Sequence, residues 1–137
     1  MNKKVAVYRK ERFNAAHRLH NSELSDTENQ VLFGKCNSPN FHGHNYDLTV
    51  KVTGEVDSKT GYVIDTKILS NIIGQHIIEK FDHKNLNLDI FEFKVLNPTA
   101  ENIAMIIYNI LREKINASLE LKIILNETEK NYVEYPA

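Results

Sequence analysis

The sequence has a single cysteine among its 137 residues, Cys36, and its formal net charge is only −1. One cysteine cannot form an internal disulfide framework, so a reducing, cytoplasmic setting is expected. A charge this small gives no overall attraction to nucleic acid or to an anionic membrane. No apolar run approaches membrane-spanning length, and no apolar stretch of a secretory signal follows the first charged residues. Nucleic acid and membranes are therefore not expected as partners.

The rest of the composition is that of an ordinary globular protein, with 42% hydrophobic and 26% charged residues. The length suits one domain, and no repeat, low-complexity tract or linker divides the chain, so we expect a single domain over residues 1–137. One local asymmetry is a basic start: residues 1–18 hold one acid, Glu11, and the basic residues Lys3, Lys4, Arg9, Lys10, Arg12 and Arg18. A solvated strand face is the default interpretation, and an anion site near His17 is the alternative.

Alternating apolar and polar residues predict the strands. The clearest alternation covers residues 45–53, beginning at Tyr46 and Leu48. Weaker patterns predict further strands over residues 5–16, 62–64, 119–125 and 131–135. If the first strand persists to its end, Phe13, Ala15 and His17 project to the same side.

Apolar residues at helical spacing predict two longer helices. One starts after an Asp65 N-cap and ends near Phe81, and the other follows a Thr99 N-cap. The irregular residues 18–40 have room for a short helix over residues 28–32, and residues 84–98 are predicted as loop. The main elements follow the order β-β-α-α-β-β. This order predicts an α+β fold, an antiparallel four-stranded sheet with both helices on one face, whose open edges favour pairing between subunits.

Three histidines form a candidate metal site. His42 and His44 lie on one face of an extended chain, because strand side chains repeat every two residues. If the first two strands pair antiparallel, His17 at the end of one lies beside them at the start of the next. Three imidazoles with an open fourth position are the ligand set of a catalytic zinc site. The alternative is a group of ordinary hydrogen-bonded histidines, which an isolated His-x-His pair would favour.

Three further features have both a functional and an ordinary interpretation. Cys36 is either a small buried hydrophobic residue or a thiolate in a polar loop close to the metal ligands. Asp82 and His83 are either a carboxylate–imidazole pair for proton transfer or a charge cluster at a helix end. Glu127 is either a turn acid or a carboxylate that accepts two parallel N–H bonds from an amidine-like edge such as that of a pterin or guanine.

Taken in order, these motifs resemble one family. They are Phe13-Asn-Ala-Ala-His17, Gly34-Lys-Cys-Asn-Ser-Pro-Asn-Phe-His-Gly-His-Asn-Tyr46, Leu69, Asp82-His-Lys-Asn-Leu86, Pro98-Thr-Ala-Glu-Asn102 and Glu127-Thr128. The set resembles the 6-pyruvoyl tetrahydropterin synthase family, which includes the 6-carboxy-tetrahydropterin synthases of queuosine biosynthesis. The resemblance covers about residues 5–135. It implies the tunnelling (T-) fold and a homohexamer of two trimeric β-barrels with active sites between subunits.

The resemblance also implies roles for individual residues. Zinc would bind to His17, His42 and His44, and Cys36 would be the catalytic thiol. Asp82 and His83 would be the proton relay, contributed by a neighbouring chain. Glu127 would anchor the pterin, with Thr99 and Glu101 near its ring. The basic start of the chain would hold the triphosphate of 7,8-dihydroneopterin triphosphate, the implied substrate.

Two products compete within the family. Five residues separate Cys36 from His42, as in the 6-pyruvoyl enzymes, whereas the 6-carboxy enzymes have a shorter spacer. The sequence departs from the family pattern at Phe41, where glycine is common, and at Asn14 and Ala16, where serine is common. The leading interpretation is a 6-pyruvoyl-tetrahydropterin-forming lyase, and the alternatives are the 6-carboxy enzyme or a non-catalytic pterin- or purine-binding protein.

Overall fold

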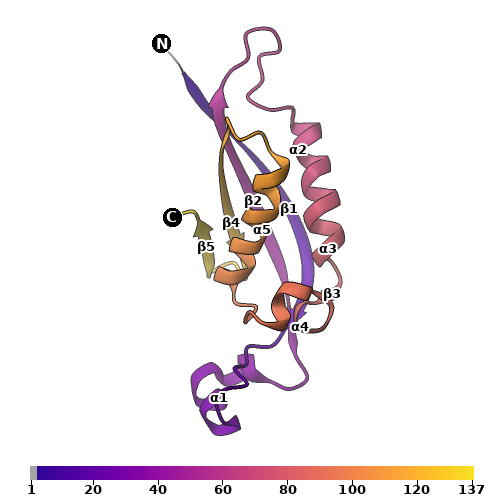
Figure 1. Ribbon diagram of the computed structural model, residues 1–137, viewed down its shortest axis with the longest axis vertical. Coiled ribbons are helices and arrows are strands. Elements are labelled where there is room, and N and C mark those ends of the chain that lie inside the picture. Colours follow the sequence, from indigo (N-terminus) through magenta and orange to yellow (C-terminus); the bar gives the residue numbers. More distant parts are fainter. Residues whose placement is uncertain (1–2) are drawn as a thin grey trace.

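The computed structural model describes residues 3–137, and its centre is one five-stranded sheet in the order β3-β1-β2-β4-β5 (Figure 1). The strands are β1 (Lys4–His17), β2 (His42–Glu55), β3 (Lys84–Asn85), β4 (Glu120–Asn126) and β5 (Tyr132–Tyr135). Neighbouring strands are antiparallel except β3, which runs parallel to β1. The predicted α+β class and the four main strands are therefore confirmed, whereas the predicted count of four strands is wrong.

The fifth strand arises in the segment that was predicted as loop. The backbone N–H of His83 donates to the Asn14 carbonyl at 2.6 Å and brings the chain alongside β1. Ala15 and Ala16 then pair with β3. The short helices α4 (Leu86–Asp89) and η3 (Phe91–Lys94) follow. A two-residue strand has no periodicity to detect, so only its partner strand reveals it. The strand predicted over residues 62–64 is also wrong, because the chain bends there towards the first long helix.

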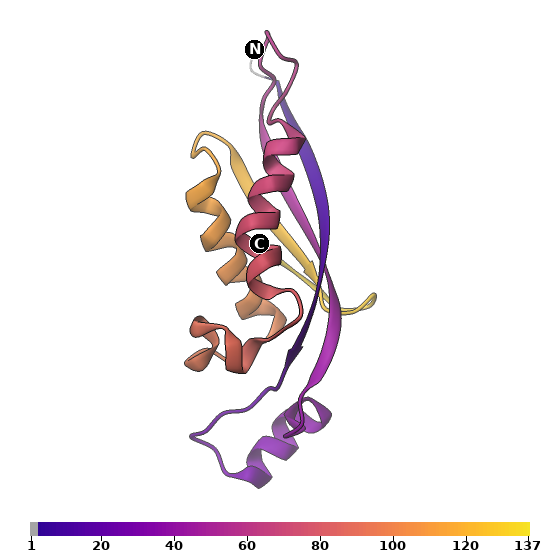
Figure 2. The same cartoon turned by 90° about the vertical axis from the view of Figure 1, so that its right-hand side faces the viewer.

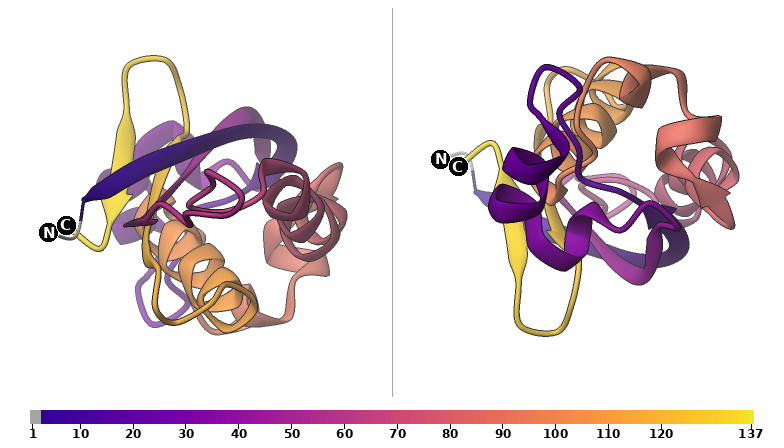
Figure 3. Two further views of the ribbon diagram at one scale, coloured as in Figure 1. Left: turned by 90° about the horizontal axis from the view of Figure 1, so that it is seen from above. Right: turned by 90° about the horizontal axis from the view of Figure 1, so that it is seen from below.

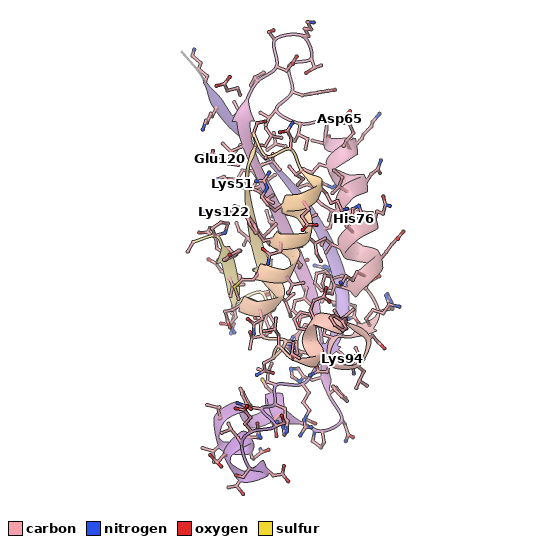
Figure 4. The ribbon with its side chains drawn as sticks, in the orientation of Figure 1. Lys51, Asp65, His76, Lys94, Glu120 and Lys122 are labelled. Carbon is pink, nitrogen blue, oxygen red and sulfur yellow. The ribbon has the colours of Figure 1, made fainter. Side chains whose placement is uncertain are left out.

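Both predicted long helices are present, and both cover the same face of the sheet (Figures 2 and 3). The first comprises α2 (Thr66–Ile73), the π-helical turn η2 (Gly74–Ile78) and α3 (Glu79–Phe81). Asp65 caps its start, where its carboxylate accepts the Lys67 N–H (Figure 4). The second is α5 (Ala100–Lys114), which begins after the Thr99 cap. None of the helices within residues 3–137 has the length and apolar character needed to cross a bilayer.

The core lies between this sheet face and the two long helices. Every second residue of β2 is fully buried, from Tyr46 to Val52. The helices contribute buried side chains at helical spacing, including Leu69, Ile73 and Ile107. Phe13 stacks on Tyr46 with ring centroids 5.0 Å apart, at the end of the core nearest the three histidines. The three histidines therefore continue the face that builds the core.

The chain between β1 and β2 projects beyond the end of the sheet (Figures 1 and 2). It holds α1 (Asp26–Phe33), which overlaps the predicted short helix, and the 3₁₀ turn η1 (Gly34–Asn37). Ser25 starts α1 with a capping box, in which its hydroxyl accepts the Glu28 N–H and the Glu28 carboxylate accepts the Ser25 N–H. The excursion returns Cys36 to the ends of β1 and β2, where the histidines lie.

Within residues 3–137, the opposite face of the sheet carries no helix and is largely polar (Figure 2). Lys51 and Lys122 lie opposite each other on adjacent strands, and both are labelled in Figure 4. The Lys51 ammonium lies 5.8 Å from the centre of the Tyr8 ring. The sheet also has open edges in residues 3–137, because β3 covers only two residues of β1 and β5 pairs on one side alone.

Candidate active site

Strand register brings the three predicted metal ligands together. His17, the last residue of β1, pairs directly with His42, the first residue of β2, and His44 is paired with Ala15. Residues that face each other across an antiparallel pair share one side of the sheet, so all three imidazoles lie on the core side. Their ligand nitrogens all lie within 4.8 Å of one another. The predicted convergence of these three histidines is confirmed.

The free nitrogens of this cluster fit a metal ion. His17 Nε2, His42 Nδ1 and His44 Nε2 are buried and have no hydrogen-bond partner within residues 3–137. His17 Nδ1 lies 2.8 Å from the Pro98 carbonyl oxygen. A carbonyl can only accept, so Nδ1 carries the proton and Nε2 presents its lone pair to the cluster. Buried polar atoms rarely remain unpaired, and a metal ion would satisfy all three.

The electrostatics of the cluster favour neutral imidazoles. Burial is the main reason that the pKa of His17 is lowered to about 4; the hydrogen bond with Pro98 raises it, and the neighbouring His42 and His44 lower it. Burial also lowers the pKa of His42, as does the nearby His44. At neutral pH both side chains are therefore unprotonated, which is the state that binds a metal ion.

Glu127 lies at the rim of the histidine cluster. Its carboxylate oxygens are 4.0 Å from His17 Nε2 and 3.9 Å from His44 Nε2. Because His17 is neutral, the first of these distances is not an ion pair. Glu127 directly follows β4, which pairs with β2, so the sheet sets its position beside His44.

One pocket joins the three residues that were predicted to bind substrate. Its volume is about 440 Å³, and Thr99, Glu101 and Glu127 line it together with Leu19, Ala100, Lys130, Asn131, Tyr132 and Val133. The volume is within the usual range for small-molecule sites. The Thr99 hydroxyl accepts the Asn102 N–H as the cap of α5. The start of α5 therefore forms one wall of the pocket and the turn after β4 another.

Cys36 lies in the 3₁₀ turn η1 and is half-buried. Its carbonyl accepts the Leu19 N–H at 2.8 Å, two residues after His17. Burial raises the pKa of the Tyr46 phenol, and the charges of Glu127 and Cys36 raise it further. The Tyr46 hydroxyl is itself 3.4 Å from His17 Nδ1. The backbone of Cys36 is thus bound to the segment that directly follows His17.

The departure at Phe41 has a backbone consequence. Phe41 adopts a φ of 66°, in the left-handed region that favours glycine, directly before His42. Its N–H closes a turn onto the Ser38 carbonyl at 3.0 Å. A glycine would adopt this conformation without strain, so the structure explains in physical terms why glycine suits the position. The side chain lines a separate pocket with Arg18 and Pro98.

Asp82 and His83 pair with each other but do not face the histidine cluster in this chain. His83 Nδ1 lies 2.9 Å from Asp82 Oδ2. The Asn14 N–H donates to Asp82 Oδ1 at 2.8 Å, and this bond and the His83 side chain hold the pKa of Asp82 below its usual value. The His83 side chain is 82% exposed at the outer edge of β1. His83 also has a φ of 60°, a strained conformation of the kind that gathers at functional sites.

Most of the basic residues at the start of β1 point elsewhere. Arg9 pairs with Glu11, Arg12 with Asp47 and Lys4 with Glu120. Arg18 differs, because it directly follows His17. The Asn14 side chain binds Asn45, and Ala16 alternates with the buried His17, so neither departure from serine faces the metal cluster within this chain.

The sequence did not predict several polar groups around the site. The Pro98 carbonyl, the Tyr46 phenol and the Asn37 amide all contact His17 or the segment that follows it. The sequence does indicate Tyr46, since it shares the strand parity of His42 and His44. It cannot indicate the Pro98 carbonyl, because every residue has a backbone carbonyl. The abundance of asparagine near the motifs was the only trace of the amide contacts.

The sequence and fold match those of known proteins. A model of the family described as 6-pyruvoyl tetrahydropterin synthase matches residues 6–137. The 6-pyruvoyl tetrahydrobiopterin synthase of Homo sapiens is 42% identical over 129 residues, which are 94% of this chain and 89% of the human protein. That of Dictyostelium discoideum is 38% identical over 136 residues, 98% of each chain.

A solved structure agrees with the sequence matches. The structure of Caenorhabditis elegans 6-pyruvoyl tetrahydropterin synthase superimposes with a TM-score of 0.94 at 40% identity, covering 99% of this chain and 97% of the other. Fold, sequence and the histidine cluster point the same way, and the chain belongs to the 6-pyruvoyl tetrahydropterin synthase family.

Proposed function

We propose that this chain is a zinc-dependent lyase that converts 7,8-dihydroneopterin triphosphate to 6-pyruvoyl-tetrahydropterin with loss of triphosphate. The observation that carries the proposal is the convergence of three histidines, whose buried nitrogens have no hydrogen-bond partner within residues 3–137, beside Glu127 and its pocket. The relatives named for this activity are similar over nearly the whole chain. The five-residue spacer from Cys36 to His42 favours the 6-pyruvoyl product over the 6-carboxy product.

Zinc is the metal that three histidines suit best, with one position left open for substrate. His17, His42 and His44 would hold it, and the Pro98 carbonyl keeps His17 in the tautomer that binding requires. When bound, zinc supplies the Lewis acidity that acidifies hydroxyl groups on the substrate side chain. The protein residues then have the tasks of binding the ring and moving protons.

Glu127 binds the ring in this proposal. Its carboxylate accepts two parallel N–H bonds from the pterin, a charge-assisted pairing that fixes the ring plane. Thr99 and Glu101 lie along the same pocket and contact the ring edge. Because Glu127 is also about 4 Å from two metal ligands, ring binding sets the distance between the substrate side chain and the cluster.

Cys36 and the Asp82–His83 pair move protons. The Cys36 thiolate removes or returns a proton bound to carbon. Asp82 holds His83 through Nδ1, which leaves Nε2 free to exchange a second proton. The side chain of the substrate is oxidised as its own pyrazine ring is reduced, so no external redox cofactor is needed. Burial in a subunit interface would place His83 from one chain opposite Cys36 of another.

The oligomer in this proposal is a homohexamer of two trimeric barrels. The unpaired edges of β1 and β5 support it, since exposed edges invite pairing with another chain. The exposed position of His83 also supports it. Residues 1–137 act as one tetrahydropterin synthase domain, and the lone free thiol suits a reducing, cytoplasmic setting.

Product analysis tests the function. Purified protein is loaded with zinc and incubated with 7,8-dihydroneopterin triphosphate, and the products are identified by mass spectrometry. The expected result is 6-pyruvoyl-tetrahydropterin and inorganic triphosphate. A predominant 6-carboxy product with acetaldehyde release would assign the chain to the other branch of the family.

A variant at Cys36 separates catalysis from simple binding. Cys36→Ala should retain zinc and pterin binding while turnover falls by at least about 100-fold, the usual contribution of a general acid or base. Unchanged turnover in Cys36→Ala would refute the assigned role of the thiol. Pterin binding without turnover in the wild type would indicate a non-catalytic binding protein.

A further inference from the structure

Asn37, the residue after Cys36, has a buried side-chain amide. The Asn37 residue is only 5% exposed, although it lies in the excursion outside the main core. A buried amide must find hydrogen-bond partners or it destabilises the fold. Its partners therefore show what the turn η1 is attached to.

Four hydrogen bonds attach η1 to the three residues after His17. Asn37 Nδ2 donates to the Leu19 carbonyl at 2.8 Å and lies 2.9 Å from His20 Nδ1. The Leu19 N–H donates to the Cys36 carbonyl at 2.8 Å. Arg18 Nε donates to the Asn37 carbonyl at 2.8 Å. These bonds run in both directions between the segment 18–20 and residues 36–37.

The segment 18–20 is itself fixed to the body of the fold. Asn87 in α4 accepts the Arg18 N–H at 2.8 Å and donates to the Arg18 carbonyl at 2.9 Å. Asn97 accepts the His20 N–H at 3.2 Å. His17 immediately before it is buried and bound to the Pro98 carbonyl. Hydrogen bonds therefore fix residues 36–37 to the segment that follows His17, and this sets the position of the Cys36 thiol relative to the histidine cluster.

We propose that Asn37 is a positioning residue that holds the Cys36 thiol at a set distance from the histidine cluster. Removing its side chain leaves the Leu19 carbonyl and His20 Nδ1 without their donor, and η1 then depends on its two remaining bonds. The proposal rests on the proposed function for its effect on turnover. Its effect on the thiol itself does not depend on that function.

The same loop offers a matched control. Asn29 is also fully buried, and its amide donates to the carbonyls of Asn21, Leu24 and Ser25. These contacts stabilise α1 and its entry but do not reach Cys36. A purely structural role predicts that Asn37→Ala and Asn29→Ala have similar effects, whereas a positioning role predicts different ones.

The test compares wild type, Asn37→Ala and Asn29→Ala as zinc-loaded full-length protein. Three quantities are measured: the melting temperature, the rate of Cys36 alkylation by iodoacetamide, and kcat and KM with 7,8-dihydroneopterin triphosphate. Both variants should melt at lower temperature. Asn37→Ala alone should alkylate several times faster and lose up to about 100-fold in kcat with KM little changed, as expected for a misplaced reacting group.

Two results would overturn the proposal. One is an alkylation rate in Asn37→Ala equal to that of wild type, and the other is the same change of rate in Asn29→Ala. If the wild type shows no turnover, the proposed function fails, but the alkylation rates still test whether Asn37 positions the thiol. Failure of the proposed function can therefore be told apart from failure of the positioning role. If Asn37→Ala does not fold, His20→Ala removes one of the two acceptors, and a smaller increase in alkylation rate is expected. An unchanged rate in folded His20→Ala then counts against the proposal.

Discussion

At the scale of single residues, His17 shows how position in the fold makes an ordinary side chain a candidate metal ligand. It is the last residue of β1, it is 1% exposed, and Pro98 fixes its tautomer. His76 has the same chemistry but lies in η2, away from the cluster. The difference between the two histidines is one of register and burial. Strand parity predicted the side of the sheet on which His17 lies, because His17 shares the parity of Phe13 and Ala15.

The metal site yields a first prediction. His42→Ala removes one of three ligands, so zinc affinity should fall by more than about 100-fold, beyond the loss typical of an outer-shell change. The measurement is chelator competition together with the zinc content of freshly purified protein. His76→Ala is the control and should bind zinc as the wild type does. Full zinc occupancy in His42→Ala would contradict the assigned site.

Asp82 yields a prediction on pH. The pKa of Asp82 lies below its usual value, chiefly because the Asn14 N–H donates to the carboxylate. A group with a lowered folded pKa stabilises the fold fully above its unfolded pKa, and this contribution is lost as the pH falls through the folded value. The unfolding midpoint of Asp82→Asn should therefore change less between neutral pH and pH 3 than that of the wild type, a statement that urea titrations at each pH can check. Parallel pH profiles for the two proteins would show that Asp82 contributes nothing.

At the scale of elements, the start of α5 combines a helix cap with residues of the candidate site. Thr99 caps the helix, its neighbour Pro98 holds His17, and Glu101 lies in the first turn and lines the pocket. The helix cap was readable from the sequence because threonine followed by an amphipathic run is a local signal. The contact from Pro98 to His17 was not, because it spans most of the chain.

Substitutions of Thr99 can test its role as the helix cap separately from its place in the pocket. Thr99→Ala should lower the free energy of unfolding by about 1 kcal/mol, since the Asn102 N–H loses its acceptor. Thr99→Ser keeps the hydroxyl and should retain most of that stability, as measured by denaturant unfolding. Equal losses in Thr99→Ser and Thr99→Ala would mean that the methyl group matters and the cap does not.

At the scale of the whole molecule, the candidate site residues lie in two separate places on the chain. The histidine cluster, Glu127 and Cys36 lie together at one end of the sheet, while Asp82 and His83 lie at the outer edge of β1. Large apolar side chains are also exposed near that end, with Phe91 at 79% and Val95 at 89%. Both features fit an assembly that buries this region against a second copy.

Subunit mixing tests the shared site. Cys36→Ala and His83→Ala should each be inactive alone, because each lacks one proton-transfer group. If the groups come from different chains, randomly mixed 1:1 oligomers regain both at about a quarter of the sites. Activity should appear only after the variants are dissociated and reassembled together. Sedimentation confirms that mixed oligomers form, and lasting inactivity in such oligomers would place both groups in one chain.

The sequence by itself determined the long elements and the residue types of the site. Alternation set β1, β2 and β4, helical spacing set the two long helices, and the His-x-His pair with His17 indicated the ligands. These are local signals, since each depends on neighbours along the chain. They also sufficed to name Cys36 and Glu127 as candidates.

Only the tertiary structure decided the rest. It revealed β3, which exists because His83 binds the Asn14 carbonyl, and it brought the Pro98 carbonyl to His17. It also fixed the path of η1 through Asn37 and turned His83 towards solvent. These features depend on backbone groups and on contacts between distant segments. A sequence pattern carries no record of them, because every residue has the same backbone donor and acceptor and only the fold selects their partners.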